Sequence, residues 1–275
     1  MRHLGLKARM AVVGSILFAF YAIAAVVIMG MFGTDVLPLV IVGSIAFVGV
    51  QYKLGKWMAL RSVGAEDLPE ERAPDLHRRV ESLSRDMGID KPRLMIASMG
   101  VPNAFAIGRK GAGTVVVSEE LLRTLDTDEV EGVLAHELAH IRNRDVVMMV
   151  LGQGVASIVA IVAQWAVLLT GDNDIADFFL AIVVGQLTQM LVMLFVFAIS
   201  RYREYVADGD AAEAIGSGEP LARALEKISR GAQGRESKVD SQAAALCIFD
   251  DRGGLASLLS THPPVEKRIE RLRSR

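Results

Sequence analysis

Four long apolar stretches constrain the fold of this 275-residue chain more than any other feature. Each is close to the ~20 apolar residues that an α-helix needs to cross a bilayer. Hydrophobic residues make up 52% of the chain and charged residues only 23%, which is too apolar for an ordinary soluble domain. The second stretch carries Gln51 and Lys53 near its end, which leaves open a tilted, shortened or partly interfacial segment. We predict an integral membrane protein with about four transmembrane helices, at residues 10–31, 36–55, 146–170 and 178–200.

The N-terminus combines Arg2, Lys7 and Arg9 with an apolar run, which is also the pattern of a signal peptide. The run over residues 11–28 is longer than the apolar core of a typical signal peptide. A second apolar stretch follows at once. We therefore expect an uncleaved membrane anchor.

Basic residues flank the four predicted spans on one side of the membrane only. They precede the first and third spans and follow the second and fourth, whereas the loops at 34–35 and 171–177 contain none. Short loops rich in Lys and Arg stay in the cytoplasm. We therefore predict that both termini and the region between the second and third spans are cytoplasmic.

Cysteine content and charge exclude some other classes of protein. The single cysteine, Cys247, permits no intrachain disulfide, as expected of a cytoplasmic domain. The formal net charge is −2, and no basic cluster is interleaved with aromatic residues. We therefore predict no nucleic-acid partner.

His136, Glu137 and His140 form the string HELAH, which is typical of a hydrolytic metal site. On a helix, residues four positions apart lie about 40° apart around the axis, so both imidazoles can reach one metal ion. A zinc ion held in this way keeps a position open for water, and the adjacent carboxylate can take the proton as water attacks a carbonyl. The motif therefore predicts peptide-bond hydrolysis.

The alternative is that these are ordinary residues of a helix surface. Against it, Asp126 and Glu129 form a capping box, and apolar residues recur at helical spacing through the motif. The chain has only five histidines, and two of them flank this glutamate at metal-ligand spacing. Asn143 lies about 20° from His136 on the helical wheel and is expected to contact a ligand or the substrate, unless it only marks the membrane boundary.

The region before the motif predicts the first part of a soluble domain. Residues 62–74 indicate a linker, 76–87 an amphipathic helix, 93–97 a strand and 103–117 a β-hairpin with glycines in its turn. The edge of such a sheet has unpaired backbone groups, to which an extended substrate can add as a strand. We therefore predict that Asn103, Ala104 and Phe105 bind substrate, while a purely structural strand fits the pattern equally well.

A catalytic zinc site needs a third protein ligand, and the segment after the fourth span offers candidates. Glu204 and Asp208 share one helix face, so that one can bind the metal and the other can orient a ligand histidine. Arg201 and Arg203 could steady these carboxylates or the substrate. The alternative for both arginines is a role as positive-inside anchors.

Four segments together resemble the HtpX family of integral-membrane zinc metalloproteases, which is related to the CAAX prenyl endopeptidases. They are HELAHIRNRD at 136–145, SRYREYVAD at 200–208, PNAFA at 102–106 and STHPPVEKRI at 260–269. The match covers nearly the whole chain in order and spacing. Residues 241–250 depart from the more aromatic or histidine-bearing versions of the family.

The resemblance implies roles for individual residues. His136, His140 and Glu204 would bind Zn²⁺, one ion per subunit, and Glu137 would be the general base and acid. Asp208 would lie behind the ligands, and His262 would stabilise the oxyanion or bind substrate. From the sequence alone, a capping or packing role for His262 before two prolines is equally compatible.

We therefore predict a mainly α, integral membrane protein with a cytoplasmic zincin-like α+β metalloprotease domain that carries a small β-sheet. The resemblance implies cleavage of misfolded or damaged membrane proteins at the cytoplasmic face of a prokaryotic plasma membrane, with polypeptides and the lipid bilayer as partners. The alternatives are a CAAX-type processing peptidase and a non-catalytic zinc-binding adaptor. The predicted parts are two transmembrane hairpins at 1–61 and 146–200 and the two portions of the protease domain at 62–145 and 201–275.

Overall fold

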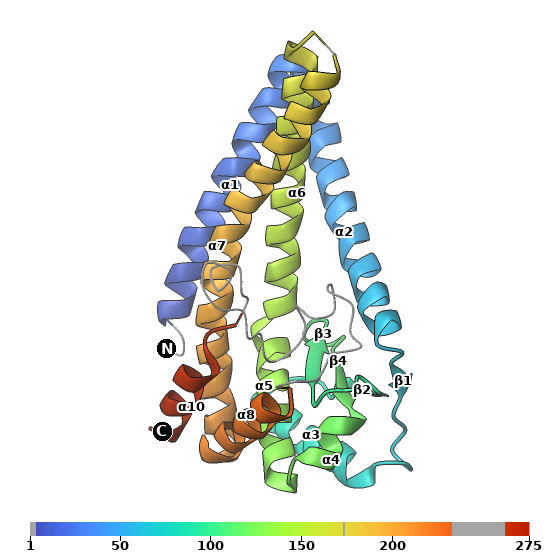
Figure 1. Ribbon diagram of the computed structural model, residues 1–275, viewed down its shortest axis with the longest axis vertical. Helices are drawn as coiled ribbons and strands as arrows, with labels where there is room; N and C mark the ends of the chain where they lie inside the picture. The colour runs from blue at the N-terminus through green and yellow to red at the C-terminus, as the bar shows by residue number, and fades with distance from the viewer. Residues whose placement is uncertain (1–3, 173, 233–261, 275) are drawn as a thin grey trace. The chain divides into compact units, whose positions relative to one another are not determined.

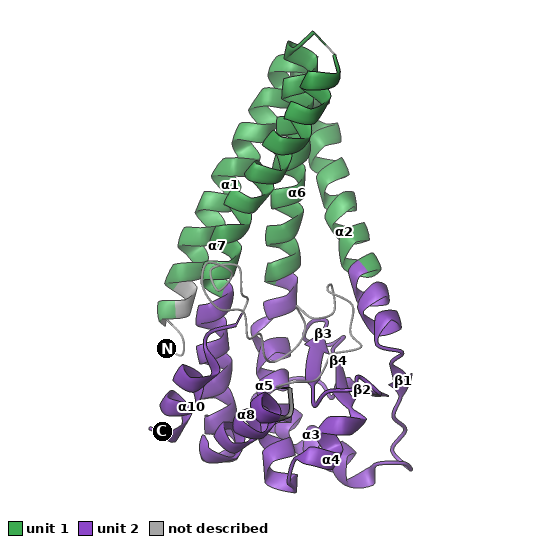
Figure 2. Ribbon diagram, viewed as in Figure 1, with its two compact units in different colours: residues 1–54, 148–199 green, residues 55–147, 200–275 purple. Residues whose placement is uncertain are grey.

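The computed structural model describes residues 4–172, 174–232 and 262–274. The chain divides into two compact units, one of residues 1–54 and 148–199 and the other of residues 55–147 and 200–275 (Figure 2). Cys247 and the segment 241–250 lie outside the described residues.

Long apolar helices make up the first unit. All four predicted apolar stretches fall within helices, and among the described residues four helices are long and apolar enough to cross a membrane. Two of them extend past the predicted ends at residues 55 and 200, because many of the residues that follow, such as Lys, Met, Ala, Leu, Arg and Glu, are good helix formers. Hydropathy marks where an apolar surface ends, which is not where the helix ends. The helices are α1 (Leu4–Phe32), α2 (Leu37–Ser62), α6 (Asp145–Thr170) and α7 (Ile175–Ile215), with the short 3₁₀ helix η1 (Thr34–Val36) between the first two.

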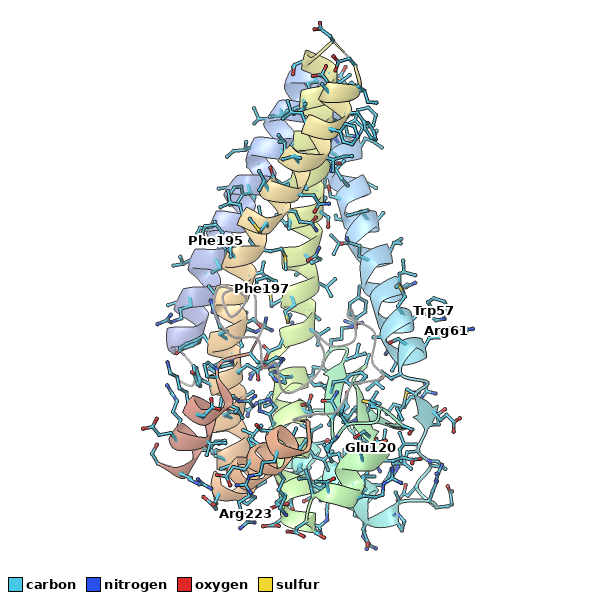
Figure 3. The ribbon with its side chains drawn as sticks, viewed as in Figure 1. Trp57, Arg61, Glu120, Phe195, Phe197 and Arg223 are labelled. Atoms are coloured by element: carbon cyan, nitrogen blue, oxygen red, sulfur yellow. The ribbon has the colours of Figure 1, made fainter. Side chains whose placement is uncertain are left out.

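Small residues allow the helices of this unit to approach each other closely. A Cβ atom at Gly152 of α6 would lie 2.7 Å from Val196 Cγ2 of α7, so only glycine fits there without a shift. Phe195 of α7, labelled in Figure 3, packs against Phe20 of α1, and their ring centroids are 6.1 Å apart. Close contact through small residues is the usual way in which membrane helices associate.

A four-stranded sheet lies in the second unit, with strand order β1-β2-β4-β3. Strand β4 pairs in parallel with β2 and antiparallel with β3, and the β3–β4 pair is the hairpin predicted over 103–117. Gly108 in its turn has φ +118°, and a Cβ atom there would lie 2.3 Å from a backbone oxygen, so the turn requires glycine. The strands are β1 (Glu66–Asp67), β2 (Arg93–Ala97), β3 (Ala104–Ile107) and β4 (Thr114–Ser118).

Helices of the second unit pack around α5, which carries the HELAH motif. Helix α5 contacts β3, α3 and α8, and α10 contacts α8 (Figure 1). The buried core is continuous through α3, the sheet, α5, α8 and α10. The helices are α3 (Pro74–Met87), α4 (Glu119–Thr124), α5 (Thr127–Asn143), α8 (Glu219–Ala232) and α10 (Val265–Arg273).

Candidate metal centre

Helix α5 begins and ends at identifiable signals in the sequence. The capping box predicted from Asp126 and Glu129 is present, with the Asp126 N–H donating to Glu129 Oε2 at 2.8 Å. The helix ends where Arg144 adopts a left-handed conformation with φ 58°. His136 and Glu137 are buried on the helix, and His140 is nearly so. The motif therefore faces the interior of the second unit.

Three side chains converge at one point. His136 and His140 of α5 and Glu204 of α7 each offer one ligand atom, and these atoms all lie within 4.8 Å of one another. The two Nε2 atoms are 3.0 Å apart, and Glu204 Oε1 is 3.3 Å from His140 Nε2. Two imidazole nitrogens and one carboxylate oxygen form a donor set that suits a divalent transition metal and leaves a coordination position open. The residues present therefore fit a catalytic metal ion.

Each histidine has a carboxylate behind it. His136 Nδ1 is 3.1 Å from Asp208 Oδ1, and His140 Nδ1 is 2.7 Å from Asp145 Oδ2. A carboxylate at Nδ1 keeps the proton there and directs the lone pair of Nε2 toward the ligand position. The two imidazoles are thus oriented in the same way by different residues.

Each of these carboxylates is in turn held by a buried arginine. Arg203 Nε donates to Asp145 Oδ1 at 2.6 Å. Arg268 of α10 donates to both oxygens of Asp208, at 3.0 Å from Nε and 2.7 Å from Nη2. Arg268 Nη1 is also 3.2 Å from Glu204 Oε2.

The burial and charge of the site shift its pKa values in opposite directions. Burial raises the pKa of Glu137, and the two neighbouring histidines only partly offset that effect. Burial lowers the pKa of His136 and His140, but hydrogen bonds and charges from the surrounding carboxylates outweigh it and raise both values overall. Because an imidazole must be neutral to bind a metal, metal binding at this site releases protons.

Glu137 also contacts the edge of the sheet. The backbone amide of Ala106 in β3 hydrogen-bonds to its carboxylate. Strand β3 is the last strand of the sheet formed by the described residues, and among those residues one of its edges has no strand partner. The candidate base therefore lies beside the backbone of the edge strand β3.

The sequence profile of peptidase family M48 matches residues 70–275. The chain belongs to peptidase family M48. The resemblance to HtpX proteases that the motifs indicated is confirmed.

Several relatives of this chain are named as HtpX proteases. A "Protease HtpX homolog" of Halobacterium salinarum is 63% identical over 96% of this chain and all of the relative. Homologues with the same name in Thermococcus sibiricus and Aquifex aeolicus are 43% and 38% identical, covering 76% and 86% of this chain and 76% and 82% of their own lengths. The protein is thus a membrane-bound metalloprotease.

A solved structure supports the M48 fold. The crystal structure of S. mikatae Ste24p superimposes with a TM-score of 0.60 at 21% sequence identity. It matches 97% of this chain, and the chain spans 63% of the length of that protein. The mostly helical architecture with a small sheet is therefore a fold shared with Ste24p.

Three other residues that were predicted for the site make specific contacts in the structure. His262 Nδ1 is 3.0 Å from Glu204 Oε2. Arg203, expected beside Glu204 and Asp208, donates to Asp145 instead. Asn143, expected beside a ligand or the substrate, donates to Asp210 Oδ2 at 2.9 Å.

The predicted substrate residues lie on the hairpin. The side chains of Asn103 and Phe105 are buried, and the Asn103 N–H donates to Ser118 Oγ at 2.9 Å. Ala104 opens the edge strand β3. Their role in substrate binding stays a prediction, and because the side chains are buried it would use the backbone of that edge.

Sequence reasoning missed Asp145 and Arg268. A signal for Arg268 was available, because it is a cation on the apolar face that Val265 and Leu272 give to α10. Asp145 has a similar signal, as an isolated acid immediately before a long apolar run. Charges in such positions are retained only when they are paired.

Proposed function

We propose that this protein is a zinc metalloendopeptidase that hydrolyses peptide bonds of misfolded or damaged membrane proteins at the cytoplasmic face of a prokaryotic plasma membrane. The convergence of His136, His140 and Glu204 beside Glu137 carries the proposal. Two histidines and a carboxylate with an adjacent glutamate are the usual ligand set and base of a zinc peptidase. We assign zinc on the same ground, one ion in each subunit.

His136, His140 and Glu204 would hold the ion. A zinc ion bound there would polarise the scissile carbonyl and lower the pKa of water. Glu137 then takes the proton of the attacking water and delivers it to the departing amine. Burial suits Glu137 to both steps, because a raised pKa brings a carboxylate closer to the working pH of a general acid and base.

The substrate binds along β3. The Ser118 N–H donates to the Asn103 carbonyl at 2.8 Å, so residues 103, 105 and 107 form the hydrogen-bonded pairs with β4. In an antiparallel ladder the alternate residues point their backbone groups the other way. Ala104 and Ala106 therefore direct their N–H and C=O groups away from β4. The Ala106 N–H contacts Glu137, and the other groups are those to which an extended peptide would add as a strand. Because such binding uses the main chain, it tolerates many sequences.

His262 lies beside a candidate metal ligand. Its ring lies 3.0 Å from the Glu204 carboxylate, and its side chain is 15% exposed. We assign it to stabilisation of the oxyanion or to substrate binding. A neutral or cationic imidazole can donate a hydrogen bond in either role.

The membrane location follows from the four apolar helices and from the distribution of charge. Each helix is long enough to span the bilayer, and basic residues lie on one side of the predicted spans. We therefore propose four transmembrane crossings with both termini and the metal centre in the cytoplasm.

Cleavage of casein by detergent-purified protein tests the function. Wild type and Glu137→Gln are stripped of metal, resupplied with Zn²⁺ and assayed, and their zinc content is measured in parallel. Zinc should restore cleavage in the wild type only, while both proteins bind it. If both proteins bind one zinc ion and neither cuts casein or an unfolded membrane protein, the chain is a zinc-binding adaptor.

A further inference from the structure

Arg268 is among the most buried charged side chains in the described residues of the second unit, with 1% of its surface exposed. It reaches the metal centre from α10, sixty residues along the chain from Asp208. Taking a guanidinium out of water is costly unless its donors are matched by acceptors. The partners of the Arg268 guanidinium therefore indicate the role of this residue.

The contacts of Arg268 converge on the candidate ligands. Its Nε and Nη2 atoms donate hydrogen bonds to the two oxygens of Asp208, and this carboxylate also contacts His136 Nδ1. Its Nη1 atom is 3.2 Å from Glu204 Oε2, and Nη2 is 3.3 Å from His136 Nε2. A single planar group thus touches two of the three candidate ligands and the residue that orients one of them.

The Arg268 guanidinium also affects the net charge of the buried site. Four buried carboxylates surround the site, those of Glu137, Asp145, Glu204 and Asp208, and two buried guanidiniums face them. With neutral imidazoles, the excess of two negative charges equals the charge of one divalent cation. Without Arg268, the excess would be three, and Asp208 would lose the partner that fixes its orientation.

We propose that Arg268 is a positioning residue for the metal ligands, which fixes Asp208, and through it His136, while it restrains Glu204. This inference rests on the proposed metal site and adds a role for α10 in forming it. The bidentate fork is the essential property, because it sets the direction of both Asp208 oxygens. A lysine carries the same charge but lacks that fixed geometry.

Metal affinity separates positioning from charge alone. Removing a positive charge should by Coulomb attraction tighten binding of a divalent cation, whereas loss of positioning should weaken it. We expect Arg268→Gln to lower Zn²⁺ affinity by about 10–100-fold, as loss of a residue that orients a ligand typically does. Arg268→Lys should also lower the affinity, by less than the glutamine variant does. Affinity is measured by competition with a chromogenic chelator on the full-length, detergent-purified protein.

Co²⁺ binding provides a readout that a merely structural role would not change. The visible absorption of bound Co²⁺ reports the geometry of its ligands, so both Arg268 variants should show an altered spectrum. Arg271→Gln is the matched control, since Arg271 lies on the same helix and stacks 4.5 Å above the Tyr205 ring without touching the candidate ligands. It should leave affinity and spectrum unchanged. Equal effects of Arg268→Gln and Arg271→Gln would reduce Arg268 to a residue that docks α10.

A double-mutant cycle tests whether Arg268 acts through Asp208. Asp208→Asn should weaken Zn²⁺ binding, and adding Arg268→Gln to it should cause little further loss, because the two residues act as one unit. Unchanged affinity and Co²⁺ spectrum in the Arg268 variants would overturn the inference while the metal site stood. Failure of the wild type to bind any divalent metal would instead refute the proposed function.

Discussion

In the unit formed by residues 1–54 and 148–199, large apolar side chains point outward. Phe18, Leu39 and Ile175 are 70%, 72% and 76% exposed, while its buried positions include Ala24 and Ala156. In the unit formed by residues 55–147 and 200–275 the arrangement is reversed, and charged side chains are buried: Glu137, Asp145, Arg203, Glu204, Asp208 and Arg268. The first unit thus has an apolar exterior suited to lipid, whereas the second unit has a charged cluster in its interior.

The difference shows where function resides. Outward apolar side chains need no partner in a lipid environment, and the first unit is held by the packing of a small apolar core in which Ala24 and Ala156 lie among leucine and valine side chains. Buried charges are costly unless each is paired, and in the second unit Asp145 pairs with Arg203, Asp208 with Arg268, and Glu204 with Arg268 and the histidines. A cluster of that kind is typical of a reactive site.

The largest effect is expected from removal of a ligand. Glu204→Ala should weaken Zn²⁺ binding by more than the roughly 10–100-fold that loss of a residue behind a ligand costs. The reason is that it removes a donor atom itself. Zinc content after dialysis against a chelator measures this, with Glu213→Ala on the same helix as the control. Stoichiometric zinc in the Glu204 variant would remove it from the ligand set.

The next effect tests the outward surface of the first unit. Phe18→Arg places a charge on the exposed face of α1 and should disfavour membrane insertion by about 2.5–3.5 kcal/mol. The amount of protein recovered from the membrane fraction and its thermal stability in detergent measure it, with Phe18→Leu as the control. Full tolerance of the arginine would mean that this face is in water.

An arginine introduced at an exposed position of the second unit should have little effect on stability. Glu71→Arg alters an exposed residue before α3 and should change the free energy of unfolding by no more than about 0.5 kcal/mol. Comparable losses from both arginine variants would abolish the contrast between the two units.

A smaller effect is expected behind His140. Asp145→Asn keeps the volume of the side chain but weakens its interaction with both His140 Nδ1 and Arg203. Zn²⁺ affinity should fall by about 10-fold, at the lower end of the range for residues that orient a ligand. Competition with a chelator measures it, and Asn143→Ala serves as a neighbour that touches Asp210 instead. No change in the Asp145 variant would mean that His140 needs no orienting carboxylate.

The smallest effect concerns the start of α5. Asp126→Ala removes the capping residue and its contact with Lys227, and should lower the free energy of unfolding by about 1 kcal/mol. Thermal unfolding of the metal-free protein measures this. Zinc affinity should not change, and a loss of affinity would show that the start of the helix is coupled to the ligands.

The sequence predicts those parts of the site that depend on local spacing. His136, Glu137 and His140 lie within one helix, and the capping box that begins it was also predicted correctly. The four apolar helices follow from hydropathy, but their lengths do not, since α7 continues for fifteen residues beyond the predicted end of its span at residue 200.

What the sequence does not predict depends on contacts between distant segments. Arg268 meets Asp208 across sixty residues, and Arg203 meets Asp145 across fifty-eight. The parallel pairing of β2 with β4 is a further case, because the hairpin alone suggested only antiparallel strands. Such pairings follow from the packing of the whole unit and not from a local pattern.

The most direct test of the central claim is X-ray absorption at the zinc edge on the purified, zinc-loaded protein. The account predicts a four-coordinate ion with imidazole nitrogens at about 2.0–2.1 Å and oxygen at about 2.0–2.2 Å. His140→Ala should remove one imidazole contribution from the spectrum. A zinc ion with sulfur ligands, or a spectrum unchanged by His140→Ala, would contradict the account.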